Sequence, residues 1–302
     1  VQNGKWFPSV LDEAFTRLRP HIPAPYLEEL NAIASGCPEV SVREIVMANI
    51  FPEYFHCSGF AVYGRATASG TLYHGRVLDY MTEIGLQQAA VTMIVAPENG
   101  HRFMNVGYAG FVGSVTGMND QGLSVGEMGG GGRGRWDGMP MTFMMRKALE
   151  DCSTVEQIVQ FWKDTPRTCE YYYVFAQGTP AAAVGVKATS EVVDLIRPGE
   201  SHPQLGDGIP DTILMSAGSR LKELRKRLET GHGTFTAESA LHLMDRPVSM
   251  RSNLHNALFA PAELKAWVAH AGARQPAAER PYVSYELGLL FNEAASFSAR
   301  TP

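Results

Sequence analysis

Cysteine and histidine are scarce in this sequence, and neither is arranged as a metal site or a disulfide framework would require. Four cysteines among 302 residues stand at irregular spacings, and no two are separated by just two residues. Small stapled domains need regular sets of cysteines, and finger-type zinc sites need paired ligands. The nine histidines include no His-Glu-x-x-His sequence. A metal hydrolase is therefore disfavoured, and we expect no metal and no other cofactor.

Long apolar runs and an excess of positive charge are also missing. No run approaches the ~20 residues of a membrane-spanning helix, so we expect no membrane span. The formal net charge of −5 at pH 7 gives no basic surface for nucleic acid. The first residue is Val1 rather than Met, which leaves open an upstream segment and leaves both export and a cytoplasmic location open. A homo-oligomer is equally open.

Hydrophobic periodicity predicts an α+β protein. Residues 1–56 predict three short helices, the third introduced by a capping box from Ser41 to Glu44. Beyond them, two blocks of strands are separated and followed by helices, and the short connections predict largely antiparallel sheets. Strands are predicted at residues 57–64, 71–78, 87–96, 101–106, 110–117, 123–128, 171–177, 181–188, 191–196, 253–259 and 282–287. Helices are predicted at residues 141–150, 155–165, 219–229 and 236–244, with a long loop at 198–211.

The hairpin predicted at residues 57–78 carries the first chemical signal. A turn at residues 66–70, centred on Ala68, places Cys57 directly opposite Asp79 at the open end. Opposed residues in an antiparallel pair have Cβ atoms about 4.5–5.5 Å apart. A thiol facing a carboxylate is a poor core pair and a plausible catalytic pair. The alternative is a buried structural cysteine beside an acid at a strand end.

The same stretch, CSGFAVYGRATASGTLYHGRVLDY, resembles the start of the mature chain in the choloylglycine hydrolase and penicillin acyltransferase superfamily of N-terminal-nucleophile (Ntn) hydrolases. Residues 75–79, GRVLD, resemble its Gly-Arg-Asn-x-Asp motif, and residues 117–123, GMNDQGL, resemble its Asn-Glu-x-Gly-Leu turn. The resemblance extends over roughly residues 25–290. It implies a four-layer αββα sandwich with two mainly antiparallel sheets, divided into a helical pro-segment, residues 1–56, and an Ntn-hydrolase domain, residues 57–302.

The resemblance also implies an activity and its residues. In the acyltransferase branch an N-terminal piece is removed by autoproteolysis, which here would cut between His56 and Cys57. Cys57 would be the nucleophile, Asp79 would hold the new amino terminus, and Arg76 would line the site. The expected reaction is cleavage of a linear, non-peptide C–N amide of a small N-acyl substrate through a thioester, which water or an amine then resolves. The freed α-amine would serve as the base of the thiol.

The sequence departs from the family at two positions. Val77 replaces the asparagine of the motif, and no asparagine stands near residues 214–216, where the family has an oxyanion donor. Replacement donors or substrate-binding residues are Gly129, Ser216, Arg220, Asn253 and Asn256.

Two other hypotheses remain open on these residues. The chain could be a non-catalytic relative that acts as a binding or scaffold protein, because it lacks the oxyanion asparagine. It could also be a cysteine amidase that works uncut, with His56 or His74 as base.

Overall fold

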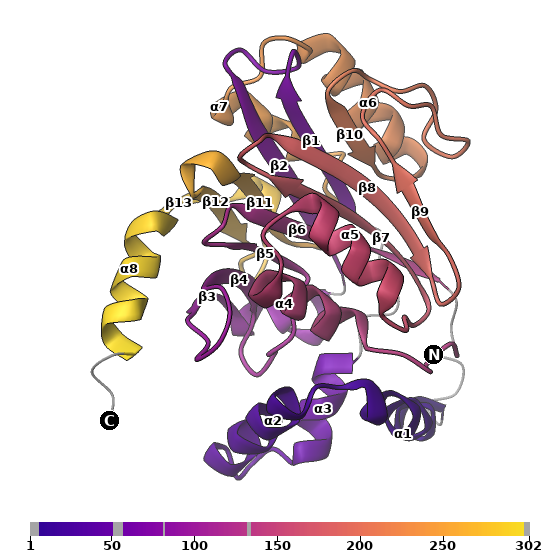
Figure 1. Ribbon diagram of the computed structural model, residues 1–302, viewed down its shortest axis with the longest axis vertical. Helices are drawn as coiled ribbons and strands as arrows, with labels where there is room; N and C mark the ends of the chain where they lie inside the picture. The colour runs from indigo at the N-terminus through magenta and orange to yellow at the C-terminus, as the bar shows by residue number, and fades with distance from the viewer. Residues whose placement is uncertain (1–5, 51–56, 81, 132–133, 299–302) are drawn as a thin grey trace.

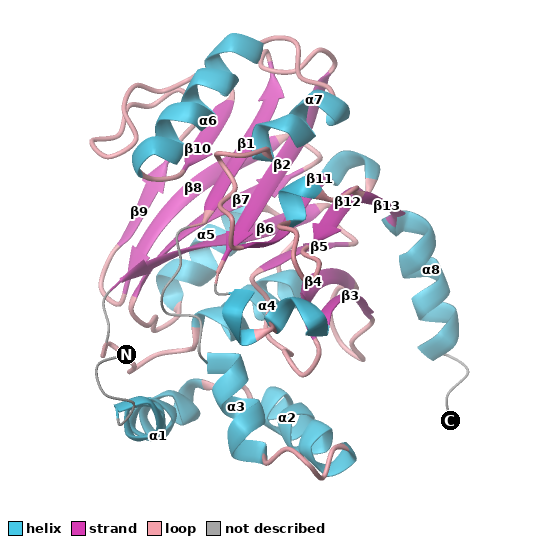
Figure 2. Cartoon of the chain, turned by 180° about the vertical axis from the view of Figure 1, so that it is seen from behind, coloured by secondary structure: helices cyan, strands magenta, loops and turns pink. Residues whose placement is uncertain are grey.

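Two antiparallel sheets lie face to face, with helices on both outer faces (Figures 1 and 2). The computed structural model describes residues 6–50, 57–80, 82–131 and 134–298. The predicted α+β class and the αββα layering are confirmed. Among the described helices, none is long and apolar enough to cross a membrane.

The first sheet has six strands in the order β10-β1-β2-β11-β12-β13. Its strands are β1 (Ser58–Gly64), β2 (Gly70–Asp79), β10 (Thr212–Met215), β11 (Asn253–Ala260), β12 (Lys265–His270) and β13 (Val283–Glu286). Helices α6 (Gly218–Gly231) and α7 (Ala237–Leu241) cover its outer face, where Leu224 and Leu228 of α6 pack on Phe60 and Val77.

The second sheet has seven strands in sequence order. They are β3 (Ala90–Val95), β4 (Phe103–Tyr108), β5 (Thr116–Asn119), β6 (Leu123–Gly131), β7 (Glu170–Gln177), β8 (Ala182–Thr189) and β9 (Val193–Ile196). Helices α4 (Met141–Asp151) and α5 (Val155–Asp164) cover its outer face through Phe143, Ile158 and Trp162.

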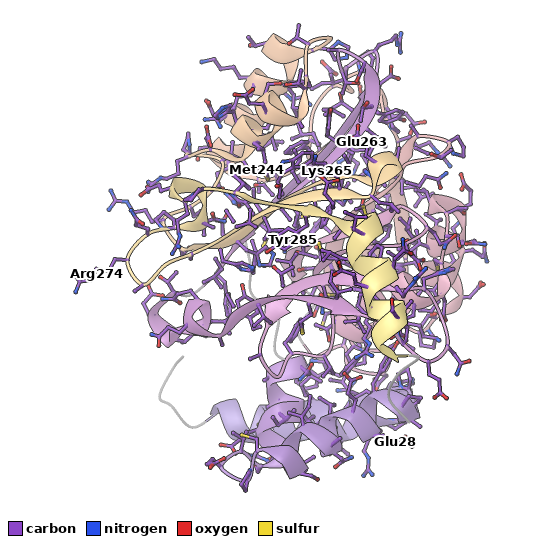
Figure 3. The ribbon with its side chains drawn as sticks, turned by 90° about the vertical axis from the view of Figure 1, so that its left-hand side faces the viewer. Glu28, Met244, Glu263, Lys265, Arg274 and Tyr285 are labelled. Atoms are coloured by element: carbon purple, nitrogen blue, oxygen red, sulfur yellow. The ribbon has the colours of Figure 1, made fainter. Side chains whose placement is uncertain are left out.

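The inner faces of the two sheets meet in two apolar clusters. One joins Ala61 and Leu72 to Val174 and Met215, and it includes Cys57. The other joins strands β4 and β5 to β11 and β12 and extends to Leu287 and Phe291 of α8 (Leu287–Ser298). Figure 3 shows α8 beside the edge of the first sheet, near Lys265 and Tyr285.

The N-terminal helices α1 (Trp6–Leu18), α2 (Ala24–Gly36) and α3 (Val42–Ile50) pack beneath α4 (Figure 1). The predicted capping box is present, since Ser41 N donates to Glu44 Oε2 (2.9 Å) and Glu44 N donates to Ser41 Oγ (3.3 Å). Buried Asn49 ties α3 to the sheet layer, because its Oδ1 accepts the backbone N–H groups of Val112 (2.7 Å) and Gly113 (3.2 Å).

That asparagine explains one wrong prediction. Residues 110–117 were expected to form a strand, but β5 begins only at Thr116. The backbone donors of Val112 and Gly113 bond to Asn49 instead of a neighbouring strand. The strand expected at residues 87–96 is also shorter, because residues 86–89 form a 3₁₀ turn. Strands β10 and β12 and helix α8 were not predicted.

The hairpin is confirmed, but its register differs by one residue from the expected pairing. Ser58 pairs with Val77 and Gly59 with Arg76, and the register shifts between Val62 and Gly64. The irregularity leaves one extra residue in β2, where Thr71 and Leu72 stand opposite Tyr63, and the pairing is not centred on Ala68. The predicted direct opposition of Cys57 and Asp79 is therefore wrong.

Candidate active site

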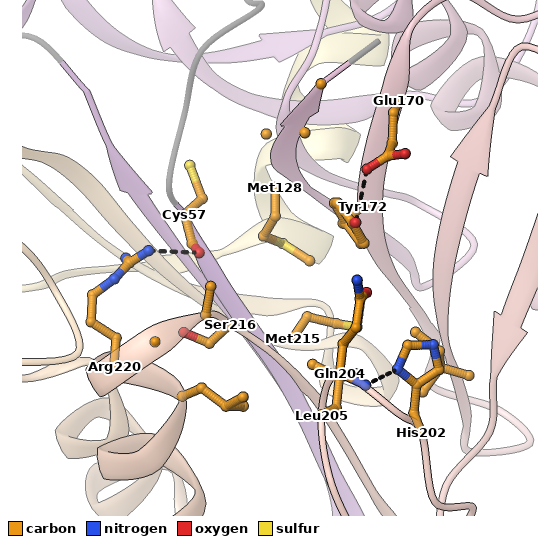
Figure 4. A pocket seen from close by; sticks show the side chains of 17 residues that line it. Cys57, Met128, Glu170, Tyr172, His202, Gln204, Leu205, Met215, Ser216 and Arg220 are labelled. Carbon is orange, nitrogen blue, oxygen red and sulfur yellow. Dashed lines mark hydrogen bonds between the residues drawn. The ribbon is translucent and has the colours of Figure 1, made fainter.

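A cavity of about 450 Å³ opens beside Cys57, where the six- and seven-stranded sheets diverge. The end of β6, the start of β7, the end of β10, the first turn of α6 and the loop of residues 198–211 surround it (Figure 4). A cavity of this size lies within the range of small-molecule sites, about 300–1,000 Å³. The chain can therefore hold a small ligand against a cysteine.

The Cys57 side chain is 4% exposed, and it lines this cavity. Its Sγ lies 3.9 Å from the backbone carbonyl oxygen of Asp79, so the two residues meet at the strand ends despite the shifted register. Burial raises the pKa of the Cys57 thiol, and the positive charge of Arg76 opposes that rise. In the uncleaved chain, these surroundings thus favour the neutral thiol of Cys57 over its thiolate.

Asp79 and Arg220 form a buried ion pair next to Cys57. Arg220 Nη1 donates to Asp79 Oδ2 (2.6 Å), and the backbone N–H of Met250 donates to Asp79 Oδ1 (2.9 Å). Arg220 Nη2 also donates to the carbonyl oxygen of Cys57 (3.4 Å). Burial raises the pKa of Asp79 to about 6, although Met250 N–H and the two arginines Arg220 and Arg76 oppose the rise. At neutral pH the pair is mostly ionised and connects the carboxylate to the Cys57 peptide.

Arg76 occupies a different place from the one that the resemblance implied. It is fully buried between the sheets and does not line the cavity. Its Nη1 donates to the carbonyl oxygen of Val77, and its Nη2 lies 3.6 Å from Glu127 Oε2. Asp79 therefore bonds to Arg220, and Arg76 acts on Cys57 and Asp79 only through its charge. The β2 alternation that puts residues 76 and 79 on opposite faces explains the separation.

Glu127 is the residue of this region that the sequence reasoning missed. It is fully buried on β6, and burial raises its pKa to about 7 against the opposing charge of Arg76. Among the described residues, both Glu127 oxygens and the Nε and Nη2 atoms of Arg76 lack hydrogen-bond partners. The pair is therefore joined by charge at 3.6 Å and not by a hydrogen bond between the two side chains. A glutamate in a strand of otherwise apolar and small residues is the signal that could have found it.

Gly129 lies at an irregularity of the β6–β7 ladder. Met128 pairs with Tyr172 and Gly131 with Glu170, so two residues of β6 stand opposite one residue of β7. Such bulges leave backbone groups outside the ladder and are frequent beside active sites. Gly129 lines the cavity, as the resemblance suggested for an oxyanion donor.

Ser216 also lines the cavity, at the turn from β10 into α6. Its Oγ lies 2.8 Å from the Oγ of Ser58, the residue after Cys57, and either hydroxyl could donate. Ser58 is fully buried. Ser58, which follows Cys57 in the sequence, thus orients the hydroxyl of Ser216, which lines the cavity.

Asn253 and Asn256 do not line the cavity, and the structure does not support them as oxyanion donors. Asn253 Nδ2 donates to the carbonyl oxygen of Leu78 (3.0 Å) and to Asn256 Oδ1 (3.0 Å). The amides brace β11 against β2 at the end that carries Asp79.

His74 also lies outside the cavity lining. It is fully buried, its Nδ1 lies 2.8 Å from Ser124 Oγ, and burial lowers its pKa to about 3. A base with that pKa and position does not suit Cys57. His56 lies outside the described residues. No group of three or more potential metal ligands occurs in the described parts of the chain.

Comparison with known proteins identifies the relatives. Residues 66–203 match the family model of acyl-coenzyme A:6-aminopenicillanic acid acyl-transferase. The structure resembles the *N*-acylethanolamine-hydrolyzing acid amidase ortholog of Caenorhabditis elegans, with a TM-score of 0.53 at 16% identity over 68% of this chain and 93% of that one. The match to the family model covers a little under half of the chain, and the solved structure shows the same fold. The resemblance read from the hairpin is confirmed.

Other relatives agree on the fold. A variant of conjugated bile acid hydrolase from Clostridium perfringens superposes with a TM-score of 0.51 at 11% identity, over 77% of this chain and 93% of that one. Protein dcd1A of Dictyostelium discoideum is 26% identical over 54% of this chain and 40% of its own length. The mouse *N*-acylethanolamine-hydrolyzing acid amidase is 22% identical over 60% of this chain and 51% of its own. The chain thus spans about half or less of the length of these two relatives.

Proposed function

We propose that the protein is a cysteine amide hydrolase or acyltransferase, activated by cleavage between His56 and Cys57, that acts on a small N-acyl substrate. The observation that carries the proposal is the position of the Cys57 thiol, which faces a ligand-sized cavity while the Asp79–Arg220 pair holds the peptide of the same residue. The names of the relatives, an amidase and an acyltransferase, support the same reaction class.

Cleavage would convert the buried thiol into a nucleophile. The freed α-amine of Cys57 has an intrinsic pKa of about 7.7–8.0, close enough to a thiol to accept its proton. The carboxylate of Asp79 would hold the resulting ammonium, since its neighbours Arg220 and Met250 fix its orientation. The charge of Arg76 favours the thiolate.

The thiolate would attack the carbonyl carbon of the substrate amide and form a tetrahedral oxyanion. Gly129 N–H and Ser216 Oγ–H are the proposed donors to that oxygen, in place of the family's asparagine. Collapse breaks the C–N bond, and the α-ammonium of Cys57 gives its proton to the leaving amine. Water or a second amine, deprotonated by the α-amine, then attacks the thioester and regenerates the thiol.

The contacts of the N-terminal helices would hold them on the rest of the protein after cleavage at residue 56. Polar contacts hold them on helix α4, including the part-buried Arg146 Nη1 to Glu29 Oε2 (2.6 Å) and the buried Thr142 Oγ1 to the carbonyl oxygen of Asn49 (2.7 Å). We therefore infer that residues 1–56 stay bound as a separate chain.

Intact mass of the purified wild type beside Cys57→Ala tests the proposal. We expect two fragments, residues 1–56 and 57–302, in the wild type and one chain in the variant, with amide turnover only in the wild type. A single chain that turns over amides would exclude the α-amine as base. A single chain with no turnover and no labelling by thiol-reactive amide or lactam probes would instead favour a binding protein.

A further inference from the structure

The cavity beside Cys57 has an uneven distribution of charge. Among the described residues that line it, only the side chains of Glu170 and Arg220 carry a full charge of fixed sign. Arg220 is already bonded to the carboxylate of Asp79 and to the Cys57 carbonyl oxygen. Within the described lining, the carboxylate of Glu170 is therefore the charged group that a substrate meets.

His202 is held by neighbours at both ring nitrogens. Its Nδ1 accepts the backbone N–H of Gln204 (3.2 Å), and its Nε2 lies 3.8 Å from the carboxylate oxygen Oδ2 of Asp194. Lys187 is a cation behind the wall of the cavity. Its Nζ lies 5.8 Å from the ring centroid of Tyr172, but Lys187 does not line the cavity.

Glu170 is held in place at the end of the cavity away from Cys57 (Figure 4). Tyr172 Oη donates to Glu170 Oε1 (2.9 Å), so one carboxylate oxygen is oriented by the wall. The β6 backbone at Gly130 passes so close that a Cβ there would lie 2.0 Å from the Glu170 carbonyl oxygen. This close packing fixes the backbone at the start of β7, and with it the position from which the Glu170 side chain extends.

Apolar side chains separate this carboxylate from the thiol. Met128 and Tyr172 lie between the two ends in Figure 4, and Ile196, Leu205 and Met215 also line the cavity. Glu170 stands two residues beyond Tyr172 on the same face of β7, which is about 7 Å along the strand. A substrate that places its carbonyl at Cys57 thus reaches Glu170 only through an apolar spacer of several bonds.

We propose that the cavity selects acyl groups with an apolar spacer and an ammonium group at the far end, which Glu170 binds. The same arrangement disfavours acyl groups that end in a carboxylate, because two like charges would be brought together with little water between them. This inference rests on the proposed amide chemistry at Cys57 for its orientation of the substrate, and it adds the class of acyl group.

The test uses three amides of the same fluorescent aminocoumarin. Their hexanoyl groups differ only at the far end, which is an ammonium, a methyl or a carboxylate group. Release of the coumarin gives kcat/KM for the wild type, and calorimetry gives Kd for the same compounds on Cys57→Ala. Binding needs no turnover, so charge selection is measured even where the amide chemistry fails. Turnover without charge selection would overturn this inference alone.

We expect the order ammonium, methyl, carboxylate in both measurements. A charge-assisted hydrogen bond at a half-buried site predicts that Glu170→Gln lowers the preference for ammonium over methyl roughly tenfold. Lys187→Met should strengthen that preference, because it removes a positive charge from behind the cavity wall. Glu156→Gln, an exposed acid on α5, is the matched control and should change neither ratio. Equal values for the three compounds, a preference for the carboxylate, no binding of any of them, or a Glu170→Gln variant with wild-type ratios would each overturn the inference.

Discussion

Replacing Arg220 with glutamine separates the structural role of the Asp79–Arg220 pair from its role in the reaction. The side chain of Asp79 is 1% exposed and that of Arg220 is 11% exposed, with 2.6 Å between Oδ2 and Nη1. Removing one partner of such a pair leaves an uncompensated buried charge, which typically costs about 3–5 kcal/mol. We expect Arg220→Gln to lose that amount of unfolding free energy at pH 8, where Asp79 is ionised.

The loss depends on pH in a direction that follows from the raised pKa of Asp79. The folded protein holds the Asp79 proton up to about pH 6, whereas the unfolded chain releases it near its ordinary value of 3.8. Stability from this group is therefore fully present below pH ~4 and declines as pH rises through 6, by about 3 kcal/mol in all. Without Arg220 the pKa of Asp79 rises further, so the deficit of the variant should grow above pH 6 and shrink at pH 5.

Urea unfolding of the wild type, Arg220→Gln and the double variant Asp79→Asn/Arg220→Gln at pH 5 and pH 8 gives these free energies. The double variant should recover part of the stability at pH 8, because no buried charge remains, but it should not recover amide turnover. Lys222→Gln, an exposed change on the same helix, controls for the loss of one positive charge. A deficit in Arg220→Gln that is below 1 kcal/mol at pH 8, or equal at both pH values, would refute this account of the pair.

Three further changes test other parts of the site and its support. Ser216→Ala should lower kcat about 100-fold with little change in KM, because its hydroxyl donates to the oxyanion. Ser58→Ala should lower kcat less, because Ser58 only positions that hydroxyl. A Ser216→Ala variant with the wild-type kcat in steady-state assays would exclude Ser216 as an oxyanion donor. Gly130→Ala should destabilise the fold and change acyl-group preference together, because its Cβ would lie 2.0 Å from the Glu170 carbonyl oxygen, and a soluble variant with unchanged melting would contradict that close approach. Asn49→Ala leaves two buried backbone donors without an acceptor, which predicts a loss of about 1–3 kcal/mol and earlier release of residues 1–56 in size-exclusion chromatography under mild urea.

The motif around the hairpin predicted the fold because its signal is local. The turn residues, the strand formers and the order Cys57 to Asp79 lie within one short stretch, and the strands that it begins define one sheet. The antiparallel connections and the helix pairs followed from spacing alone. The elements that were missed are short or ambiguous: β10 has four residues, and α8 follows directly on β13.

The register error shows the limit of counting along a hairpin. A single irregularity between Val62 and Gly64 changes every pair beyond it. The sequence contains no marker that places it there, because the glycines at both ends of the turn are compatible with several geometries. The thiol still meets the strand end of Asp79, since the contact is made with a backbone oxygen instead of the opposing side chain.

The assignment of the two arginines depends on contacts between residues far apart in the chain. The resemblance implied that Arg76 lines the site with Asp79, but alternation along β2 directs Arg76 toward Glu127 and Asp79 toward α6. Arg220 reaches Asp79 from a helix 141 residues later in the chain. A strongly charged helix is usually a solvated face, and only the packing of Leu224 and Leu228 on the outer face of the first sheet turns its first arginine inward. The pairing of Asp79 with its cation is thus a property of how α6 docks on the sheet, and any substitution that displaces α6 should reach the cysteine through that carboxylate.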